Sequence, residues 1–315
     1  MNTTSAPAQR AVPRLSIGVP VYNEERYIEL CLRSILEQTY GDFEIIVCDN
    51  ASTDRTCEIV QSLAQQDPRI VLHRAPRNLG ASANFNWAVT LARGELFKWC
   101  AADDLMHPAL LQSCIDGLDA TPDAVLAFSG AVDIDAKGEL IGEIYDNREP
   151  WRFDSPNVQT RVHELVCRNH SCIAVFGVIR RSALLKTKLI GSYTGSDRTL
   201  LLELGLQGKL IRTGDDLLLH REHERRSVRQ FKELQERTVW FDTSAKGRAF
   251  PAWRLTSEYL RAITVCGQPF SQKIRCFLEV ARFLKWYQAG ALLNDVRYHL
   301  ATFFSRRKSA SSEKA

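Results

Sequence analysis

The sequence predicts an α/β protein: a doubly wound, mostly parallel β-sheet flanked by helices, with a C-terminal helical extension. Two observations indicate this fold class. Short apolar runs of strand length alternate with segments whose apolar residues recur at helical spacing. The chain has 315 residues, 45% of them hydrophobic and 25% charged, which is enough for one large domain or two modest ones.

The first hundred residues carry the clearest alternation. Each of the first three expected strands is followed by a helical pattern, and Asn23 is placed to cap the first helix. Beyond residue 108 we expect a helix, a strand at 124–130, and loops or a hairpin in 133–161. A strand at 172–180, a helix at 197–208 and a short hairpin in 209–221 follow. The four early strands are expected at 15–22, 43–49, 70–74 and 95–100.

Charge divides the chain unevenly. From residue 231 to the end there are 15 Lys and Arg against 7 Asp and Glu, whereas the preceding part has 26 against 30. The two parts therefore face different partners. The net charge of +4 is too small to indicate nucleic acid binding. We expect a flexible leader at 1–13, a catalytic domain at 14–230, a basic helical extension at 231–305 and a disordered tail at 306–315.

The extension contains an amphipathic helical pattern. Its apolar stripe is surrounded by basic residues, and a further basic cluster follows at Arg306, Arg307 and Lys308. Such a helix can lie on an anionic membrane, or it can pack on the catalytic domain as most amphipathic helices do. The stripe consists of Ile274, Phe277, Leu278, Ala281 and Leu284, and the basic residues around it are Lys273, Arg275, Arg282 and Lys285.

The nine cysteines are odd in number and lack Cys-x-x-Cys spacing, so neither a zinc site nor a redox site is indicated. A reducing compartment is the simplest interpretation. The first residues have no apolar stretch of signal-peptide type, and no apolar run reaches the ~20 residues of a membrane span. We expect a cytoplasmic protein, with the inner face of the membrane as a candidate peripheral location.

Polar residues gather where the expected strands end. Tyr22 and Asn23 follow the first strand, Asp49 ends the second, and Asp103 and Asp104 follow the fourth. Ligands of open parallel sheets bind at these carboxyl ends. Adjacent carboxylates suit Mg²⁺ or Mn²⁺ shared with substrate phosphates. Alternatively, Asp104 caps a helix that begins near Pro108, or both residues belong to a solvated turn.

Three further segments carry candidate chemistry. Asp49 can accept a hydrogen bond from a nucleobase, or it can organise a turn with Ser52. Arg77 and Asn78 offer a guanidinium and an amide suited to pyrophosphate. Asp197 precedes an apolar helix, where it can act as a general base or as an N-cap.

The segment His220 to His223 follows an expected strand. Its imidazoles can bind metal or phosphate, or they can line a solvated loop.

Several segments in a fixed order resemble family 2 glycosyltransferases with the GT-A fold. They cover about residues 14–229, and their joint order is far more specific than any one motif. Ala101 departs from the pattern, because many members have the first Asp of the metal-binding motif there. The segments are LSIGVPVYNEERYIELCLRSILEQTY, EIIVCDNASTDRT, RNLGASANFNWAVTLARGE, WCAADDLMHPALL, SDRTLLLELGLQGKL and LLLHREHERRS.

This resemblance implies an inverting, metal-assisted hexosyltransferase of polysaccharide biosynthesis, which uses a UDP-, GDP- or dTDP-sugar and Mn²⁺ or Mg²⁺. The acceptor would be a saccharide or a lipid-linked saccharide. Asp197 would be the catalytic base, and the metal ligands would be Asp104, Asp103 and His223. The implied nucleotide-binding residues are Pro20, Tyr22, Asn23, Glu24, Asp49, Arg77, Asn78 and Asp103.

Two other functions remain open from the sequence. Loss of the first Asp at Ala101 is compatible with a catalytically silent GT-A-fold binding protein. A nucleotidyltransferase shares the sheet and the metal, but the sequence lacks the Gly-rich phosphate loop with Lys that such enzymes usually need near the N-terminus.

Overall fold

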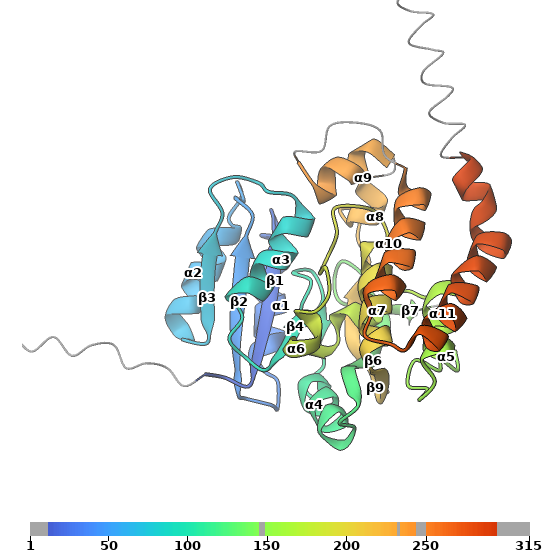
Figure 1. The fold of residues 1–315 in the computed structure, drawn as a ribbon. Coiled ribbons are helices and arrows are strands. Elements are labelled where there is room, and N and C mark those ends of the chain that lie inside the picture. Colours follow the sequence, from blue (N-terminus) through green and yellow to red (C-terminus); the bar gives the residue numbers. More distant parts are fainter. Residues whose placement is uncertain (1–11, 145–148, 232–233, 244–249, 295–315) are drawn as a thin grey trace, which may run out of the picture.

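The computed structural model describes residues 12–144, 149–231, 234–243 and 250–294 (Figure 1). Its strands are β1 (Leu15–Val21), β2 (Phe43–Asp49), β3 (Ile70–Arg74), β4 (Leu96–Trp99), β5 (Leu105–Met106), β6 (Ala124–Ile134), β7 (Leu140–Glu143), β8 (Val178–Arg180) and β9 (Lys209–Arg221). Its helices are α1 (Ile28–Leu36), α2 (Thr56–Gln66), α3 (Ala81–Leu91), α4 (Leu110–Ala120), α5 (Val158–Cys167), α6 (Arg181–Leu184), α7 (Ser196–Gln207), α8 (Ser227–Gln230), α9 (Leu234–Phe241), α10 (Pro251–Val265) and α11 (Phe270–Phe283). A 3₁₀ turn, Ile173–Phe176, precedes β8, and a π-helical turn, Leu284–Gln288, follows α11.

The strands form one mixed sheet in the order β3-β2-β1-β4-β8-β6-β9-β5, with β7 paired to β6. The pairs among β3, β2, β1 and β4 are parallel, as the alternating sequence predicts. Strand β2 is buried along its whole length because its side chains alternate between two cores. Ile45 and Val47 pack with residues of α1 and α2, and Ile46 and Cys48 pack with residues of α3.

The predicted cap of α1 is wrong. The helix begins at Ile28, and no side chain caps it. Asn23 instead adopts a left-handed conformation with φ of 56°. Its side-chain oxygen accepts a hydrogen bond from Thr53 N at 2.8 Å, so it joins the ends of β1 and β2.

Two later elements also differ from the prediction. The apolar segment 172–180 is a 3₁₀ turn and a short strand, separated at Gly177, where a Cβ would stand 2.4 Å from the Ala127 carbonyl oxygen. Segment 209–221 is a single long strand rather than a hairpin. Its turn-like residues coincide with register shifts against β6, so they form bulges within the strand.

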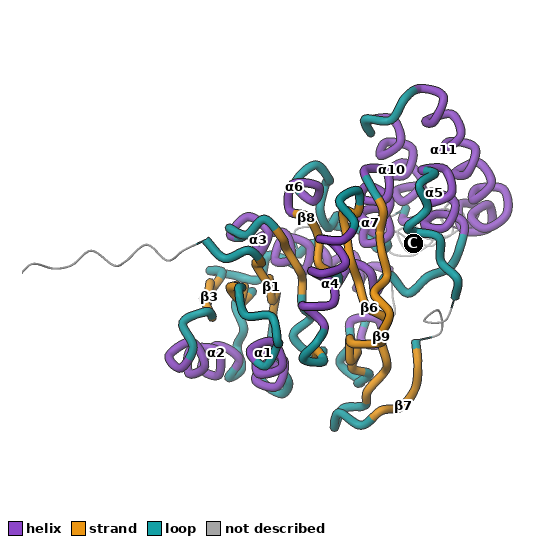
Figure 2. The backbone as a smooth tube through the Cα atoms, turned by 90° about the horizontal axis from the view of Figure 1, so that it is seen from below, coloured by secondary structure: helices purple, strands orange, loops and turns teal. Residues whose placement is uncertain are grey.

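The predicted helix breaks near Pro251 and 267–269 are confirmed, and α10 and α11 lie side by side at the end of the molecule remote from β3 (Figures 1 and 2). These helices share a core with α5 and α7, in which Val162, Leu202, Tyr259, Ile263 and Val280 take part. The extension is therefore packed on the sheet domain. Residues 1–11 of the expected leader and the expected tail 306–315 lie outside the described residues.

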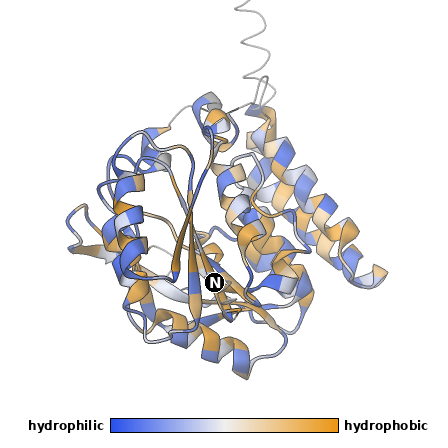
Figure 3. Cartoon of the chain, turned by 90° about the vertical axis from the view of Figure 1, so that its left-hand side faces the viewer, coloured by the Kyte–Doolittle hydropathy of each residue, from blue (hydrophilic) through white to orange (hydrophobic). Residues whose placement is uncertain are grey.

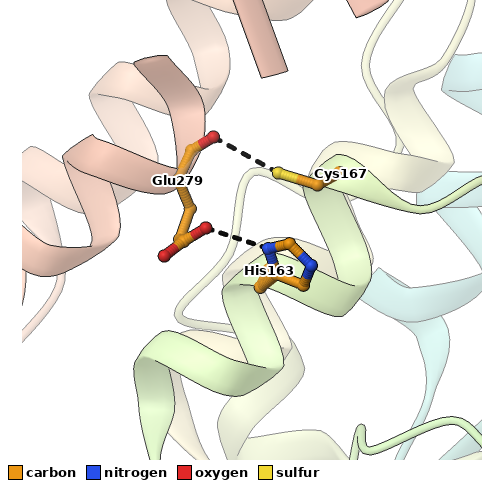
Figure 4. A group of neighbouring side chains, drawn as sticks. All are labelled: His163, Cys167 and Glu279. Atoms are coloured by element: carbon orange, nitrogen blue, oxygen red, sulfur yellow. Dashed lines mark hydrogen bonds and ion pairs between the residues drawn. The ribbon is translucent and has the colours of Figure 1, made fainter. Parts of the chain in front are cut away.

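A polar clamp fixes α11 to α5 (Figure 4). The Glu279 carboxylate is 1% exposed and pairs with His163 Nδ1 at 2.9 Å and with Arg282 Nη1 at 2.8 and 2.9 Å. The Cys167 thiol donates to the Glu279 backbone carbonyl at 3.3 Å. Burial raises the pKa of Cys167 to about 11. The Glu279 carboxylate is thus satisfied by an imidazole, an amide and a guanidinium, and the group acts as a structural clamp between α5 and α11.

In the described part of the chain, no helix has both the length and the apolar character needed to cross a membrane.

Candidate active site

A large cleft opens at the carboxyl ends of β1, β2 and β4. It encloses about 2290 Å³ including its open mouth. Polar groups from the ends of several strands converge there, as the sequence predicts for this sheet edge. The lining includes Pro20, Tyr22, Asn23, Glu24, Asn50, Asn78, Asn84, Asp103, Asp104, Phe176, His220, Arg225, Arg226, Phe231 and Trp240.

The acidic pair lies in the floor of this cleft. Asp104 is 2% exposed, and its Oδ1 accepts a hydrogen bond from Arg221 N at 2.9 Å. Asp103 Oδ2 pairs with His223 Nε2 at 2.9 Å. Burial, and then the charge of Asp103, raises the pKa of Asp104 well above its ordinary value. A cation at this position would relieve the repulsion between the two carboxylates.

Arg221 holds this acidic loop in place. Its guanidinium donates to the carbonyl oxygens of Asp103 at 2.8 Å and Asp135 at 2.9 Å, and lies 4.8 Å from the ring centre of Tyr27. The side chain is almost completely buried. Arg221 therefore joins the end of β9 to the β4–β5 loop, the β6–β7 turn and the start of α1. The sequence marks it only as part of a His-rich segment.

Glu24 stands beside the acidic pair on the cleft wall. Burial, and then the negative charge of Asp103, raises its pKa to about 7. Arg225 opposes this rise, and its Nη2 donates to the Asn23 carbonyl oxygen at 2.7 Å. The β1 end and the loop after β9 are thus connected at the cleft rim.

Asp49 lies behind the cleft rather than in its lining. Its carboxylate is 0% exposed and accepts hydrogen bonds from Ser52 N at 3.1 and 3.2 Å and from the Cys57 thiol at 2.9 Å. Arg74 Nε is 3.3 Å from the same group. The turn-forming role considered from the sequence is therefore present, and contact with a donor base stays a prediction.

Asn50 and Asn78 connect the ends of β2 and β3, and Asn84 connects α3 to the ends of β1 and β2. Asn50 donates to Asn78 Oδ1 at 3.0 Å and accepts from Leu79 N at 2.8 Å. Asn84 donates to the Cys48 carbonyl at 2.9 Å, but its buried Oδ1 has no partner within the described residues. Asn84 is among the residues that line the cleft, although this oxygen itself is shielded from solvent, and sequence reasoning missed the residue. Arg77 is exposed and is not among the lining residues.

Helices α8 and α9 close one side of the cleft. Phe231 and Trp240 contribute aromatic surface, and Arg225 and Arg226 contribute cations. Helix α9 approaches α3 at Gly80, which has φ of 88° and would place a Cβ 2.6 Å from the Phe241 carbonyl oxygen. A glycine is therefore required where this wall meets the sheet domain. The sequence showed a helix here but gave no sign that it reached the cleft.

Asp197 lies in the first turn of α7, outside the cleft lining. The N-cap position belongs to Gly195, with φ of 86°, so the N-cap alternative for Asp197 is wrong. Its Oδ1 accepts from Arg198 N at 2.8 Å. Helix α7 packs against the turn that carries Phe176, which is part of the cleft wall. The role of Asp197 as a base stays a prediction.

A second acidic group borders the cleft, formed by Asp133, His220 and Glu222. Arg226 Nη2 is 2.9 Å from His220 Nε2, and Arg226 also pairs with Glu222. A guanidinium thus already occupies the position that a cation would take. Within the described residues, the predicted ligands Asp103, Asp104 and His223 do not form a group in which all three ligand atoms lie close to one another.

A family model described as glycosyl transferase family 2 matches residues 16–187, which is more than half of the chain. The chain belongs to this family. The match includes the ends of β1, β2 and β4 and the acidic pair. It ends before Asp197, His223 and the α8–α9 wall. The assignment of those parts therefore depends on the structure and on the resemblance of their segments.

The curated relatives share the sheet-forming part of the chain. A chondroitin synthase of Escherichia coli is 34% identical over 137 residues, which is 44% of this chain and 20% of that protein. An uncharacterized glycosyltransferase of Methanocaldococcus jannaschii is 36% identical over 143 residues, 45% of this chain and 49% of the relative. The chain thus matches less than half of the length of each of these two relatives, one of which is a chondroitin synthase.

Solved structures confirm the GT-A-like fold. TarS of S. aureus, in complex with UDP-GlcNAc, has a TM-score of 0.63 at 15% identity and covers 87% of this chain and 73% of its own. The mannosyltransferase PcManGT from Pyrobaculum calidifontis, in complex with GDP-Man and Mn²⁺, has a TM-score of 0.57 at 20% identity. That alignment covers 95% of this chain and 77% of PcManGT.

The pKa of Glu24 predicts a pH-dependent gain in stability on substitution. A carboxyl whose pKa is raised by folding binds more protons in the folded state, so stability falls as the pH rises from 4.5 towards about 7. In metal-free buffer, Glu24→Gln should raise the melting temperature relative to wild type at about pH 8 and much less at about pH 5. A difference that is the same at both pH values would contradict the buried setting of Glu24.

Proposed function

We propose that this family 2 protein transfers a hexose from a nucleoside-diphosphate sugar to a hydroxyl acceptor with inversion. The observation that carries the proposal is the acidic pair in the floor of a large cleft, at the carboxyl ends of three parallel strands, with Asp104 buried and Asp103 partly exposed. The cleft walls supply aromatic, amide and guanidinium groups, which are the groups expected around a nucleotide and its diphosphate. The acceptor would be a saccharide or a lipid-linked saccharide.

The nucleoside would bind against the ends of β1 and β2. Tyr22 and Asn23 line this part of the cleft with Pro20. Asp49 lies behind this part of the cleft. Its carboxylate would accept a hydrogen bond from the donor base, because it has lone pairs beyond those used in its present hydrogen bonds. UDP-, GDP- and dTDP-sugars are all candidate donors, and the ligands of TarS and PcManGT are of this class.

The residues present fit a divalent cation of the Mn²⁺ or Mg²⁺ type. Asp104 and Asp103 provide carboxylate oxygens in the cleft, and His223 holds Asp103 from behind through Nε2. When bound, such a cation would neutralise charge on the departing diphosphate. Arg225 and Arg226 face the same cleft and would add to this electrostatic stabilisation. His223 is thus better placed to position Asp103 than to be a ligand itself.

Asp197 would serve as the base. In the transfer, the acceptor oxygen forms a bond to the anomeric carbon while the bond from that carbon to the diphosphate oxygen breaks. The acceptor proton would pass to the Asp197 carboxylate, and the bond electrons would leave with the nucleoside diphosphate. The buried leucines of α7, Leu200, Leu201 and Leu204, anchor the turn that carries Asp197.

Donor binding can be tested by thermal unfolding with UDP-, GDP- and dTDP-sugars, with and without Mn²⁺. One donor class should stabilise the protein by about 2.7 kcal/mol at a hundredfold excess over its dissociation constant, with Mn²⁺ required. Asp104→Asn should lose the Mn²⁺-dependent part, whereas the exposed control Asp116→Asn should keep it. Absence of stabilisation by every donor would contradict the proposal, and binding without transfer would favour a silent binding protein.

Asp197→Asn separates a chemical role from a structural one. Loss of the charge from the first turn of α7 should cost less than about 1 kcal/mol of stability. Turnover should fall by a factor on the order of 10² to 10⁴, the usual contribution of a positioned base, with donor affinity unchanged. Initial rates at saturating donor, together with donor affinity, measure this. Transfer at the wild-type rate would remove Asp197 from the mechanism.

A further inference from the structure

We propose that the outer face of the α10–α11 pair docks on an anionic lipid surface. This inference goes beyond the glycosyl transfer proposed above and does not depend on it. It begins from the way α11 is packed. The inner face of α11 presents Cys276, Val280 and Phe283 to the core shared with α5 and α7, and it is clamped there by Glu279.

The apolar stripe identified in the sequence is mostly not this packed face. Ile274 is 45% exposed, Leu278 is 54% exposed, and Phe270 at the start of the helix is 79% exposed. These three residues are spaced by four, so they form one line along the helix. Phe277 and Leu284 lie at its border, partly buried against the core. Helix α11 is thus apolar on two sides, and one of them faces outward.

The exposed apolar surface extends beyond this line. Val265 and Phe270 stand on either side of the turn between the helices, with 65% and 79% of their surface exposed. Trp286, in the π-helical turn, is 69% exposed. From Phe270 to Trp286 the helix spans about 24 Å, which is the scale of an interfacial helix lying in the plane of a membrane. The helices at the right of Figure 3 carry orange apolar residues among blue polar ones.

The charges around this surface identify its partner. Both carboxylates of residues 251–294, Glu258 and Glu279, are buried and paired with basic side chains. By contrast, Arg275 and Lys285 are exposed, and Arg282 follows Leu278 by one turn with its side chain 57% exposed. Lys285 lies 4.7 Å from the Trp286 ring centre. The exposed surface of these two helices therefore combines apolar and basic side chains and has no exposed carboxylate. The apolar side chains are complementary to the acyl layer of a membrane, and the basic side chains are complementary to acidic headgroups.

This complementarity favours lipid over other occupants. A second copy of this chain would bring the same basic residues to the interface, so like charges would face each other there. Tryptophan and lysine at the edge of an apolar stripe are also the residues that membrane interfaces favour. The basic cluster Arg306, Arg307 and Lys308 lies outside the described residues, and the proposal rests on the helices alone.

The test is co-sedimentation of the full chain with vesicles of phosphatidylglycerol and phosphatidylcholine in equal parts, and with phosphatidylcholine alone. The chain should bind the anionic vesicles at low salt and be released at high salt. Replacing Arg275 and Lys285 by Gln should weaken binding by about 25-fold, given ~1 kcal/mol for each basic residue near the surface. The pair Phe270→Ser and Leu278→Ser should weaken it at least as much, without lowering the melting temperature.

Matched variants make the outcome specific. Leu140→Ser and Ile141→Ser replace equally exposed apolar residues on β7 and should leave vesicle binding unchanged. Failure to bind anionic vesicles at low salt, or equal binding to phosphatidylcholine alone, would overturn the proposal. So would binding that is lost only when Arg306, Arg307 and Lys308 are neutralised. Concentration-dependent dimerisation abolished by Phe270→Ser would show instead that the face contacts a second copy.

Discussion

The candidate active site depends on the contacts that the buried Arg221 makes. Arg221 reaches the backbone of the acidic loop and of the β6–β7 turn, while its own backbone N–H holds the Asp104 carboxylate. A buried cation is costly unless it is paired and hydrogen-bonded. Here the guanidinium donates to two backbone carbonyl oxygens and lies against the Tyr27 ring, while its Nη2 has no hydrogen-bond partner among the described residues. Arg221 therefore positions the acidic pair through the backbone of its loop and through its own backbone N–H.

This arrangement holds Asp104 in a buried position while Asp103 stays partly exposed. Asp104 has an elevated pKa because it lacks solvent and stands beside Asp103, and Glu24 has an elevated pKa for the same two reasons. Folding thus disfavours the ionised forms of the two carboxyl groups that lie near Asp103. A bound cation would stabilise the ionised forms of these carboxyl groups. The strain lies in the charges of the cleft, whereas the surrounding strands and helices are well packed.

The parallel part of the fold was predictable because its strands are buried on both faces. LSIGVPV and FEIIVCD read as continuous apolar runs, and the helices between them show a single apolar face. The segment 172–180 is equally apolar, and apolar content alone does not separate a strand from a 3₁₀ turn. The bulged β9 was mistaken for a hairpin because TGDD is turn-like, while its partner β6 is far away in the sequence.

The candidate site was predictable in part, for a similar reason. Residues at strand ends, such as Asn23, Asp103 and Asp104, could be placed at one sheet edge from strand order alone. Other site residues could not be predicted in this way. The role of Arg221 arises from a contact between segments more than a hundred residues apart. The roles of Asn84 and Trp240 depend on which face of a helix meets the cleft. The extension shows the same limit: its apolar stripe was visible in the sequence, but which side would be covered was not.

The central claim is that Asp104 and Asp103 bind a divalent cation together with a nucleoside diphosphate. The most direct measurement is the anomalous signal of Mn²⁺ in crystals grown with Mn²⁺ and the nucleoside diphosphate that stabilises the protein. We expect a single strong peak in contact with an Asp104 carboxylate oxygen and with diphosphate oxygens. Bound diphosphate with no Mn²⁺ at Asp104, or with Mn²⁺ held instead by Asp133, His220 and Glu222, would contradict it.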